Sequence, residues 1–497
     1  MIKKLILYLL LNCLVISTYA IEHNKPCNFS GKIISDQGTP KLQIVFFENY
    51  ITGFGNEFLP RNIPVSKNGL FQFSIPKIDH PGRLLIQDIV SGSVFCDFQI
   101  VNPGDNIYVK IDIRNNKVNI KFSGKGSAKY ECINLISQIN QDTIYQEKNI
   151  NKRIKLADSI MLLKYGILER YKSRISPNIV QIIKADVSGD IENLVIGPLI
   201  ISETVPYEEK VRAKGEFDIY NQTANGKLSF SDYNLTLSPK YIRFLYTKIK
   251  LELGFDNLDK EFEFKDIYNK IRRNYSGVLR ERLLCFCILN PDVQYTLQCS
   301  DPNEYTACLK DAVSLIKTRA YHKIIHQELI TRGKGSKAFD FEFAADSPGK
   351  QVHLSDFNGK VVLIDMWGYI CTGCYLFTNA FHEKIYPEFK DNPNFKVISI
   401  MTNGTKDQYL KRLRRESKPY YTFADYINLY GAGSPATMEY IIKYYNISAM
   451  PFLLLIDKKG NIYSSTIFID GDKPDKIELL RSTIEKALAE PAIIRNE

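Results

Sequence analysis

The spacing of apolar residues changes twice along this 497-residue chain, and these changes limit the folds that it can adopt. Apolar residues alternate with polar ones up to about residue 122, recur at helical spacing up to about residue 332, and then follow alternating strands and helices. A period of two predicts strands, and a period near 3.6 predicts helices. A chain of this length usually divides into several domains. The sequence therefore predicts a multidomain protein with a β-rich, an α-helical and an α/β part.

The first part alternates most clearly at residues 71–75 and 107–113, where every second side chain is apolar. Such segments form strands with one buried face. Asn68 and Gly69 precede the first segment and are typical of a hairpin turn. We expect an antiparallel β-sandwich over residues 21–125, with a small barrel as the alternative, and a binding or spacer role.

Helical spacing dominates residues 126–335. The clearest apolar stripe is Leu156, Ile160, Leu163, Ile167 and Tyr171. Side chains three and four positions apart share one face of an amphipathic helix. We expect an α-helical domain here, and a Gly-rich joint at residues 333–336 separates it from an α/β domain over residues 336–497.

The first twenty residues have the pattern of a secretory signal peptide. Lys3 and Lys4 precede an apolar run over residues 5–16, and the small residues Thr18 and Ala20 follow it. The alternative is an uncleaved anchor, but the run is shorter than the roughly 20 apolar residues that a spanning helix needs. We therefore expect residues 1–20 to be a signal peptide and the protein to be exported to the periplasm.

Charge and cysteine content exclude two further classes. The net charge of +10 is mild for this length, and no arginine-rich run suggests nucleic-acid binding. Ten cysteines are too few for a disulfide-framework protein of this size. Cleavage of the signal peptide removes Cys13 and leaves an odd number, so at least one thiol is unpaired. The hydrophobic cores must stabilise the fold.

Two other groups of residues have open interpretations. Cys285 and Cys287 point to different helix faces, so either could pair with Cys299 or Cys308, or all could be buried free thiols. His322 and His326 are spaced to share a helix face, but no glutamate of a zinc-protease helix lies between them. We favour surface or core histidines there.

The segment with the clearest chemistry is Cys371, Thr372, Gly373 and Cys374, a C-x-x-C sequence after a buried-looking strand at residues 361–366 and at the start of a helix. Amide groups and the dipole at a helix N-terminus favour negative charge, so we expect a lowered pKa for the Cys371 thiol. Its thiolate can attack a disulfide, and Cys374 can then displace the captured sulfur.

Two alternatives apply to this cysteine pair. It could be half of a zinc site, but no second pair at ligand spacing follows. It could also be a local structural disulfide, although a strand-to-helix turn is a costly place merely to join four residues. We predict a redox-active dithiol that needs no metal and no cofactor.

At this point residues from about 338 to 490 resemble the thioredoxin fold, and in particular the TlpA/ResA-like thiol-disulfide oxidoreductases. The resemblance rests on residues 354–360, the strand that ends at Trp367, the C-x-x-C, and residues 445–460. The β-then-helical region before them is similar in layout to the N-terminal extensions of Bacteroidetes members.

The resemblance implies three catalytic residues. Cys371 would be the nucleophile and Cys374 the resolving cysteine. Asp365 matches the buried acid of thioredoxins, whose raised pKa allows it to accept the proton of the resolving thiol. The alternative for Asp365 is an exposed aspartate at a strand end.

The resemblance also implies a substrate-binding face. Pro451, after Met450, occupies the position of a cis-proline that faces the cysteines and exposes backbone to an extended substrate. The alternative is a trans proline that opens a strand. Trp367 belongs to this group, and we expect it to pack beside the site rather than to take part in the chemistry.

Two departures from the family pattern are visible. Asn379 occupies the place of a helix-kinking proline, and residues 420–438 resemble an inserted helical segment that shapes the choice of partner.

The resulting hypothesis is an exported oxidoreductase that reduces or exchanges disulfides of protein substrates through a mixed disulfide. The resemblance favours the reductive direction, which requires a membrane thiol carrier as electron donor. The alternatives are a peroxiredoxin-like peroxide reductase and a protein that binds a partner or glycan and has a vestigial thioredoxin domain. Nucleic acid is not an expected partner.

Overall fold

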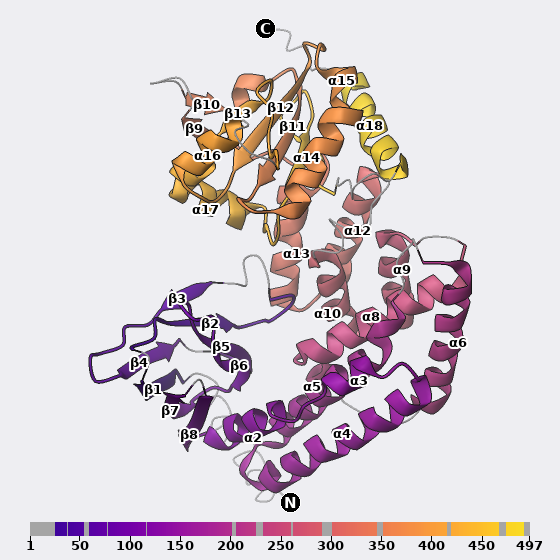
Figure 1. Ribbon diagram of the computed structural model, residues 1–497. Helices are drawn as coiled ribbons and strands as arrows, with labels where there is room; N and C mark the ends of the chain where they lie inside the picture. The colour runs from indigo at the N-terminus through magenta and orange to yellow at the C-terminus, as the bar shows by residue number, and fades with distance from the viewer. Residues whose placement is uncertain are drawn as a thin grey trace, which may run out of the picture. The chain divides into compact units, whose positions relative to one another are not determined.

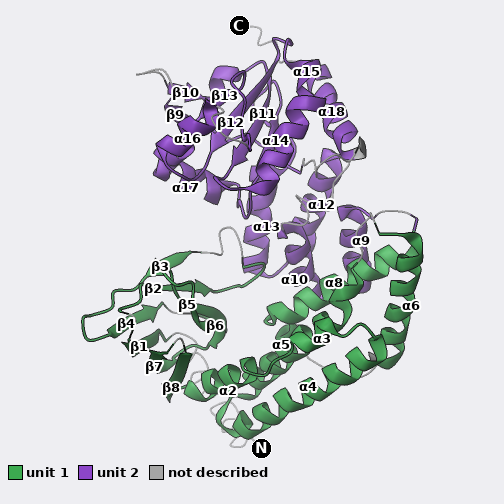
Figure 2. Ribbon diagram, viewed as in Figure 1, with its two compact units in different colours: residues 1–53, 57–258 green, residues 54–56, 259–497 purple. Residues whose placement is uncertain are grey.

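The computed structural model describes residues 25–36, 38–53, 59–76, 78–115, 117–200, 205–224, 232–259, 262–290, 301–344, 351–414, 419–466 and 474–491. The predicted signal peptide, residues 1–20, lies outside the described residues, as do Cys13 and Cys299. The chain forms two compact units, shown in Figure 2, one over residues 1–53 and 57–258 and the other over residues 54–56 and 259–497. We describe each unit by itself.

Unit 1 begins with two four-stranded sheets that share one core. The strands are β1 (Cys27–Ser35), β2 (Leu42–Phe47), β3 (Pro60–Asn62), β4 (Leu70–Ile75), β5 (Gly82–Asp88), β6 (Val94–Val101), β7 (Asn106–Arg114) and β8 (Lys117–Lys125). The orders are β4-β1-β7-β8 and β3-β2-β5-β6. Phe29 and Phe71 of one sheet share a core with Leu42 and Leu84 of the other, which confirms a sandwich. One neighbouring pair, β1 and β7, is parallel, so the sandwich is not wholly antiparallel.

The helices of unit 1 follow directly. They are α2 (Ser127–Ser137), α3 (Asp142–Gln146), α4 (Ile150–Tyr171), α5 (Pro177–Ile196), α6 (Tyr207–Ala224), α7 (Asp232–Thr236) and α8 (Pro239–Asp256). Helix α2 is joined to the sandwich by a buried ion pair, in which the Lys129 ammonium group lies 2.6 Å from Asp105. The Tyr130 hydroxyl group donates to the same carboxylate. This buried network holds the first helix against the sheets.

Unit 2 contains the remaining helices of the predicted helical region. They are α9 (Phe264–Asn274), α10 (Gly277–Leu289), α12 (Pro302–Leu315) and α13 (Arg319–Arg332). The predicted helical segment, residues 126–335, is therefore helical as expected, but its helices are shared between the two units. We propose that the β-rich, α-helical and thioredoxin-like segments of the sequence span residues 21–125, 126–335 and 336–497.

The α/β part of unit 2 is built on a five-stranded sheet of order β13-β12-β11-β14-β15. Figure 1 labels β13, β12 and β11 of this sheet. Its strands are β11 (Val361–Trp367), β12 (Phe395–Met401), β13 (Ile427–Leu429), β14 (Phe452–Ile456) and β15 (Ile462–Ser464), and a separate hairpin is formed by β9 (Glu342–Ala344) and β10 (Gln351–His353). Strands β11 and β12 run parallel, whereas β14 is antiparallel to β11. All residues of the central strand β11 are buried, as its continuous apolar sequence predicts.

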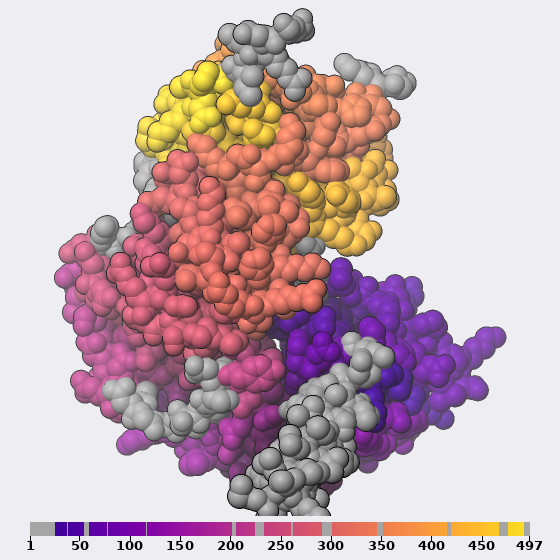
Figure 3. Space-filling view, turned by 180° about the vertical axis from the view of Figure 1, so that it is seen from behind, coloured from indigo at the N-terminus to yellow at the C-terminus, as the bar shows by residue number. Residues whose placement is uncertain are grey.

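Helices cover both faces of this sheet. They are α14 (Thr372–Lys384), α15 (Tyr386–Phe389), α16 (Lys406–Leu413), α17 (Pro435–Tyr444) and α18 (Pro474–Ala489). Phe377 of α14 and Leu480 of α18 share a core with Leu363 on one face. Met438 of α17 packs with Ile364 on the other face. Figure 3 shows α18, in yellow, within the same continuous surface as the orange residues of this α/β part.

Helices α12 and α13 are joined to the α/β part within unit 2 by buried polar contacts. The guanidinium group of Arg332 donates to the Ser465 carbonyl oxygen at 3.0 Å and lies 5.3 Å from the centre of the Phe452 ring. It also pairs with Glu328 at 2.8 Å, and both side chains are buried. The Tyr305 hydroxyl group donates to Glu328. These contacts connect α12 and α13 to strand β14.

The multidomain fold predicted from the sequence is confirmed: β-sheets, then helices, then an α/β domain. Within the described residues, no helix combines the length and the apolar character needed to cross a bilayer.

Candidate active site

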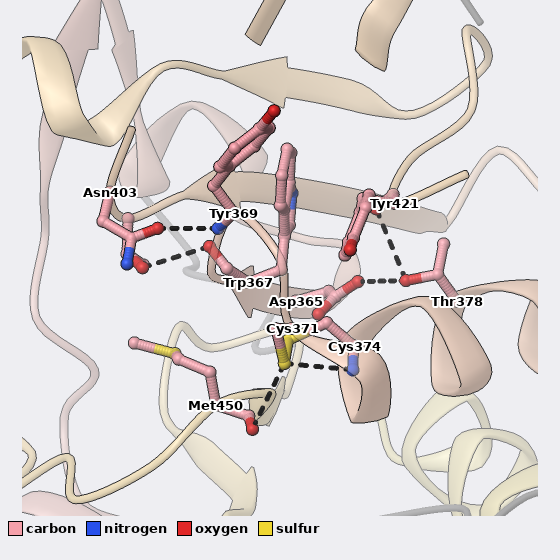
Figure 4. Close-up of a disulfide and its surroundings, with 10 residues drawn as sticks. Asp365, Trp367, Tyr369, Cys371, Cys374, Thr378, Asn403, Tyr421 and Met450 are labelled. Atoms are coloured by element: carbon pink, nitrogen blue, oxygen red, sulfur yellow. Dashed lines mark hydrogen bonds between the residues drawn. A yellow bond between two sulfur atoms is a disulfide. The ribbon is translucent and has the colours of Figure 1, made fainter. Parts of the chain in front are cut away.

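The cysteine pair lies where strand β11 passes into helix α14 (Figure 4). Cys371 and Cys374 form a disulfide with 5.3 Å between their Cα atoms. Cys371 is the N-cap of α14, and its sulfur accepts a hydrogen bond from the Cys374 backbone N–H group at 3.2 Å. The Cys371 side chain is partly exposed, whereas Cys374 is fully buried. The arrangement gives one sulfur atom that a substrate can reach and one that it cannot.

The loop before Cys371 has an unusual backbone. Ile370 has a φ of 68°, in the left-handed region that a β-branched residue rarely adopts, and its side chain is 75% exposed. The amide group of Tyr369 donates to the Asn403 side chain at 2.6 Å. The Thr402 amide and hydroxyl groups both donate to the Trp367 carbonyl oxygen. Residues after β12 therefore hold the loop in place.

Pro451 lies opposite the cysteines, as the sequence predicts. The Met450–Pro451 peptide bond is cis. The Met450 carbonyl oxygen is 3.5 Å from the Cys371 sulfur atom. A Cβ added to Gly373 would lie 3.4 Å from the Pro451 ring, an ordinary contact distance, so the turn between the cysteines lies directly against this proline.

Asp365 is buried inside the domain, in the middle of β11 (Figure 4). Its Oδ2 atom accepts a hydrogen bond from the Thr378 hydroxyl group of α14 at 3.1 Å, whereas Oδ1 has no hydrogen-bond partner among the described residues. Burial raises the pKa of Asp365 to about 7, and the Thr378 hydroxyl group opposes this rise. The alternative of an exposed strand-end aspartate is excluded. The carboxyl group can hold or release a proton near neutral pH.

Trp367 is fully buried and makes packing contacts. Its ring stacks on Tyr421 with 5.2 Å between ring centres, and its indole N–H group donates to the Ser399 hydroxyl oxygen at 2.9 Å. Trp367 therefore packs beside the cysteine pair, as we expect from the sequence. Direct contact between Trp367 and a substrate stays a prediction.

Several residues of the site were not singled out from the sequence. They are Tyr369, Thr378, Ser399, Asn403, Arg412 and Tyr421. The Arg412 guanidinium group of α16 lies over the rings of Tyr369 and Tyr421, at 5.4 and 4.9 Å. Only one feature of the sequence could have indicated some of these residues, namely the basic and aromatic composition of residues 406–421.

The structure shows the surroundings of the two departures from the family pattern, Asn379 and residues 420–438. The Asn379 amide group donates to the Tyr375 carbonyl oxygen at 2.6 Å and to the Tyr420 carbonyl oxygen at 2.9 Å, which joins α14 to the segment before β13. Residues 420–438 are not simply helical as expected, since they contain β13 before α17 begins at Pro435. The expected helical segment is thus present only from Pro435 onward, because residues 427–429 gain sheet pairing with β12.

The remaining candidates do not join the site. His322 and His326 stack with 6.0 Å between ring centres on α13. Among the described residues, no group of three or more His, Cys, Asp or Glu side chains could hold a metal ion. Cys308 is a buried free thiol, and Cys285 and Cys287 are buried in α10. A partnership of any of them with Cys299 lies outside the described residues.

The sheet order, the cysteine pair at the start of α14 and the cis-proline define a thioredoxin-like domain. A thioredoxin-like family model matches residues 358–462. The TlpA/ResA-like resemblance is confirmed for this part of the chain.

Curated relatives support this class. The chain is 27% identical over 136 residues to the thiol-disulfide oxidoreductase ResA of Bacillus thuringiensis, a match that covers 27% of this chain and 69% of the relative. It is 23% identical over 158 residues to ResA of Geobacillus kaustophilus, covering 31% of this chain and 83% of that protein.

Solved structures include similar chains. The thioredoxin domain of a thiol-disulfide oxidoreductase from Bacteroides vulgatus is 27% identical, with a TM-score of 0.24, and the match covers 31% of this chain and 96% of that one. A thioredoxin-like protein from Bacteroides caccae is 13% identical, with a TM-score of 0.29, over 62% of this chain and 94% of that one.

Proposed function

We propose that this protein is a thiol-disulfide oxidoreductase that reduces or exchanges disulfides of protein substrates outside the cytoplasm. The observation that carries the proposal is the Cys371–Cys374 disulfide at the N-terminus of α14, with a reachable sulfur, a buried sulfur and a buried carboxyl group of raised pKa. Curated relatives named as thiol-disulfide oxidoreductases support it. The pattern of residues 1–20 supports export.

The reaction starts from the dithiol form. The Cys371 thiolate, favoured by the α14 amide groups, attacks one sulfur of a substrate disulfide. A mixed disulfide forms between Cys371 and the substrate, and the other substrate sulfur leaves as a thiolate that takes up a proton. The substrate backbone would lie along the partly exposed Met450, whose carbonyl oxygen is beside the Cys371 sulfur atom.

The second step releases the product. The Cys374 thiol gives its proton to the Asp365 carboxylate, and its sulfur attacks the Cys371 sulfur. The substrate leaves as its second thiolate, and the protein retains the Cys371–Cys374 disulfide. The substrate has gained two electrons and the protein has lost two. An external dithiol must reduce the protein again, and we propose a membrane thiol carrier for this role.

Trapping tests the proposal. In Cys374→Ser the resolving sulfur is absent, so mixed disulfides between Cys371 and its substrates should accumulate when disulfide-containing proteins are added to the reduced protein. Non-reducing gels and mass spectrometry would identify them, with Cys371→Ser as the matched control. Equal cross-linking in both variants would overturn the proposal. Rapid consumption of hydrogen peroxide by Cys374→Ser, without turnover of protein disulfides, would instead favour a peroxide reductase.

A further inference from the structure

A cavity in unit 1 lies between the β-sandwich and the helices that follow it. It has a volume of about 590 Å3 and is lined by residues of β5, β6, α2, α4, α5 and α8. Figure 1 shows β6 and α2 as neighbours, and they are in contact. Pockets for small molecules commonly have volumes of about 300–1,000 Å3. The cavity is large enough for a ligand of two small rings.

The cavity has an open mouth and a buried floor. Asp97, Asp142 and Arg243 line it with exposed side chains. Lys164 and Val187 line it with buried side chains. A ligand can therefore enter from solvent and reach groups that water contacts poorly.

The charged groups that line the cavity balance one another. The carboxylates are Asp97, Asp142, Asp186 and Asp190, and the cations are Arg83, Lys164, Lys240 and Arg243. Two of the opposite charges are paired across the wall, Arg83 with Asp186 at 2.6 Å and Lys240 with Asp190 at 2.9 Å. A charged ligand of either sign would meet like charges beside its partners, which costs binding free energy. A neutral ligand meets no such penalty.

Hydrogen-bond donors and acceptors both line the cavity. The Gln141 amide group donates to Asp190 at 2.9 Å, while its oxygen accepts from the Lys164 ammonium group. The Oδ1 atom of Asn193 is buried and has no donor among the described residues. A buried acceptor without a donor costs free energy, which a ligand hydroxyl group could recover. Burial also lowers the pKa of Lys164 to about 8.

An aromatic surface lies beside these polar groups. Tyr50 and Phe98 both line the cavity, and their rings meet edge to face with 5.1 Å between centres. Phe98 has a φ of 45°, which is rare for a bulky residue. Such strain persists only where the surroundings enforce it, and it concentrates at ligand sites. Here Arg83 donates to the Phe98 carbonyl oxygen.

We propose that this cavity binds a neutral mono- or disaccharide. Each sugar hydroxyl group both donates and accepts hydrogen bonds, which suits a wall that carries both carboxylates and cations. The apolar C–H face of a sugar ring suits the rings of Tyr50 and Phe98. The sugar gives an O–H donor to Asn193 and leaves the paired charges undisturbed.

Calorimetric titration of the full chain tests this proposal. The probes are glucose, galactose, N-acetylglucosamine, maltose and cellobiose, with inorganic phosphate as an anionic probe and the zwitterionic dipeptide Ala-Ala as a probe that carries both charges. We expect at least one sugar to bind at millimolar or lower concentration, and the charged probes not to bind. Binding of phosphate or Ala-Ala in preference to every sugar, or no binding of any sugar, would overturn the proposal.

Substitutions of cavity residues test whether the sugar binds in this cavity. Asn193→Leu removes the unpartnered oxygen, and Phe98→Ala removes the aromatic face, so each should weaken sugar binding by about tenfold or more. Asn151→Leu, on the exposed side of α4 and outside the cavity lining, is the matched control and should bind as the unchanged protein does. The circular-dichroism spectrum of each variant confirms its fold. Unweakened binding in both folded cavity variants would contradict the site.

Discussion

At the scale of a single residue, the buried Asp365 carboxyl group links stability to pH. Its pKa is raised from 3.8 to about 7 in the folded protein, so the folded state binds the proton more tightly than the unfolded state does. Stability contributed by the protonated form is present below about pH 4 and is lost as the pH rises toward 7. This loss corresponds to about 4 kcal/mol for a fully buried group.

Asp365→Asn should therefore stabilise the folded protein above pH 7, by up to about 4 kcal/mol, and have little effect at pH 4. Denaturant unfolding of the oxidised protein at the two pH values measures the difference. Asp391→Asn, an exposed aspartate of unit 2, is the control and should change neither value. The same Asp365→Asn variant should resolve mixed disulfides more slowly at neutral pH. If Asp365→Asn left the free energy of unfolding at pH 8 unchanged, this would contradict an energetic cost of ionising the buried Asp365 carboxyl group.

Thr378 is the second residue with a specific expected effect, through its hydrogen bond to Asp365. Thr378→Val removes a donor that favours the charged carboxylate, so the pKa of Asp365 should rise further. The pH profile of insulin disulfide reduction should shift to higher pH, with slower turnover at pH 7 that recovers toward pH 9. Thr378→Ser keeps the hydroxyl group and should retain the original profile. A uniform loss of rate at every pH would indicate a packing defect instead.

At the scale of elements, helix α13 and strand β14 are joined through Arg332. Replacement of Arg332 by Met would leave the buried Glu328 carboxylate without its ion-pair partner, which typically costs about 3–5 kcal/mol. We expect this loss in denaturant unfolding of unit 2. The double variant Glu328→Gln and Arg332→Met should recover part of it, because no uncompensated charge remains buried. Equal losses in the single and double variants would rule out the charge as the cause.

At the scale of the whole molecule, unit 2 should behave as one folding body. Gly335 donates to the Ile462 carbonyl oxygen at 2.8 Å, and Ile462 donates to Ser336 at 2.8 Å, so the end of the helical region is hydrogen-bonded to the sheet. A chain of residues 259–497 should unfold in one cooperative thermal transition, at a higher temperature than a chain of residues 336–497. Two separate transitions in the longer chain would show that α9–α13 fold independently.

The sequence alone determined those features whose cause is local. The continuous apolar run of β11 requires burial on both sides, the C-x-x-C lies at the following helix start, and Pro451 directly precedes a strand. Each of these needs only neighbouring residues to be recognised.

Tertiary structure decided what depends on residues far apart in the chain. Tyr421 stacks on Trp367, Asn403 accepts a hydrogen bond from Tyr369, and Thr378 donates to Asp365. These contacts form only because β12, β13 and α14 pack around β11. The three-residue strand β13 is too short to show a period, and it forms because β12 offers a free edge. Helical spacing is the same on both sides of residue 258, so it could not reveal that the last helices pack with the α/β domain. Periodicity records which face of an element is buried, but not which other element buries it.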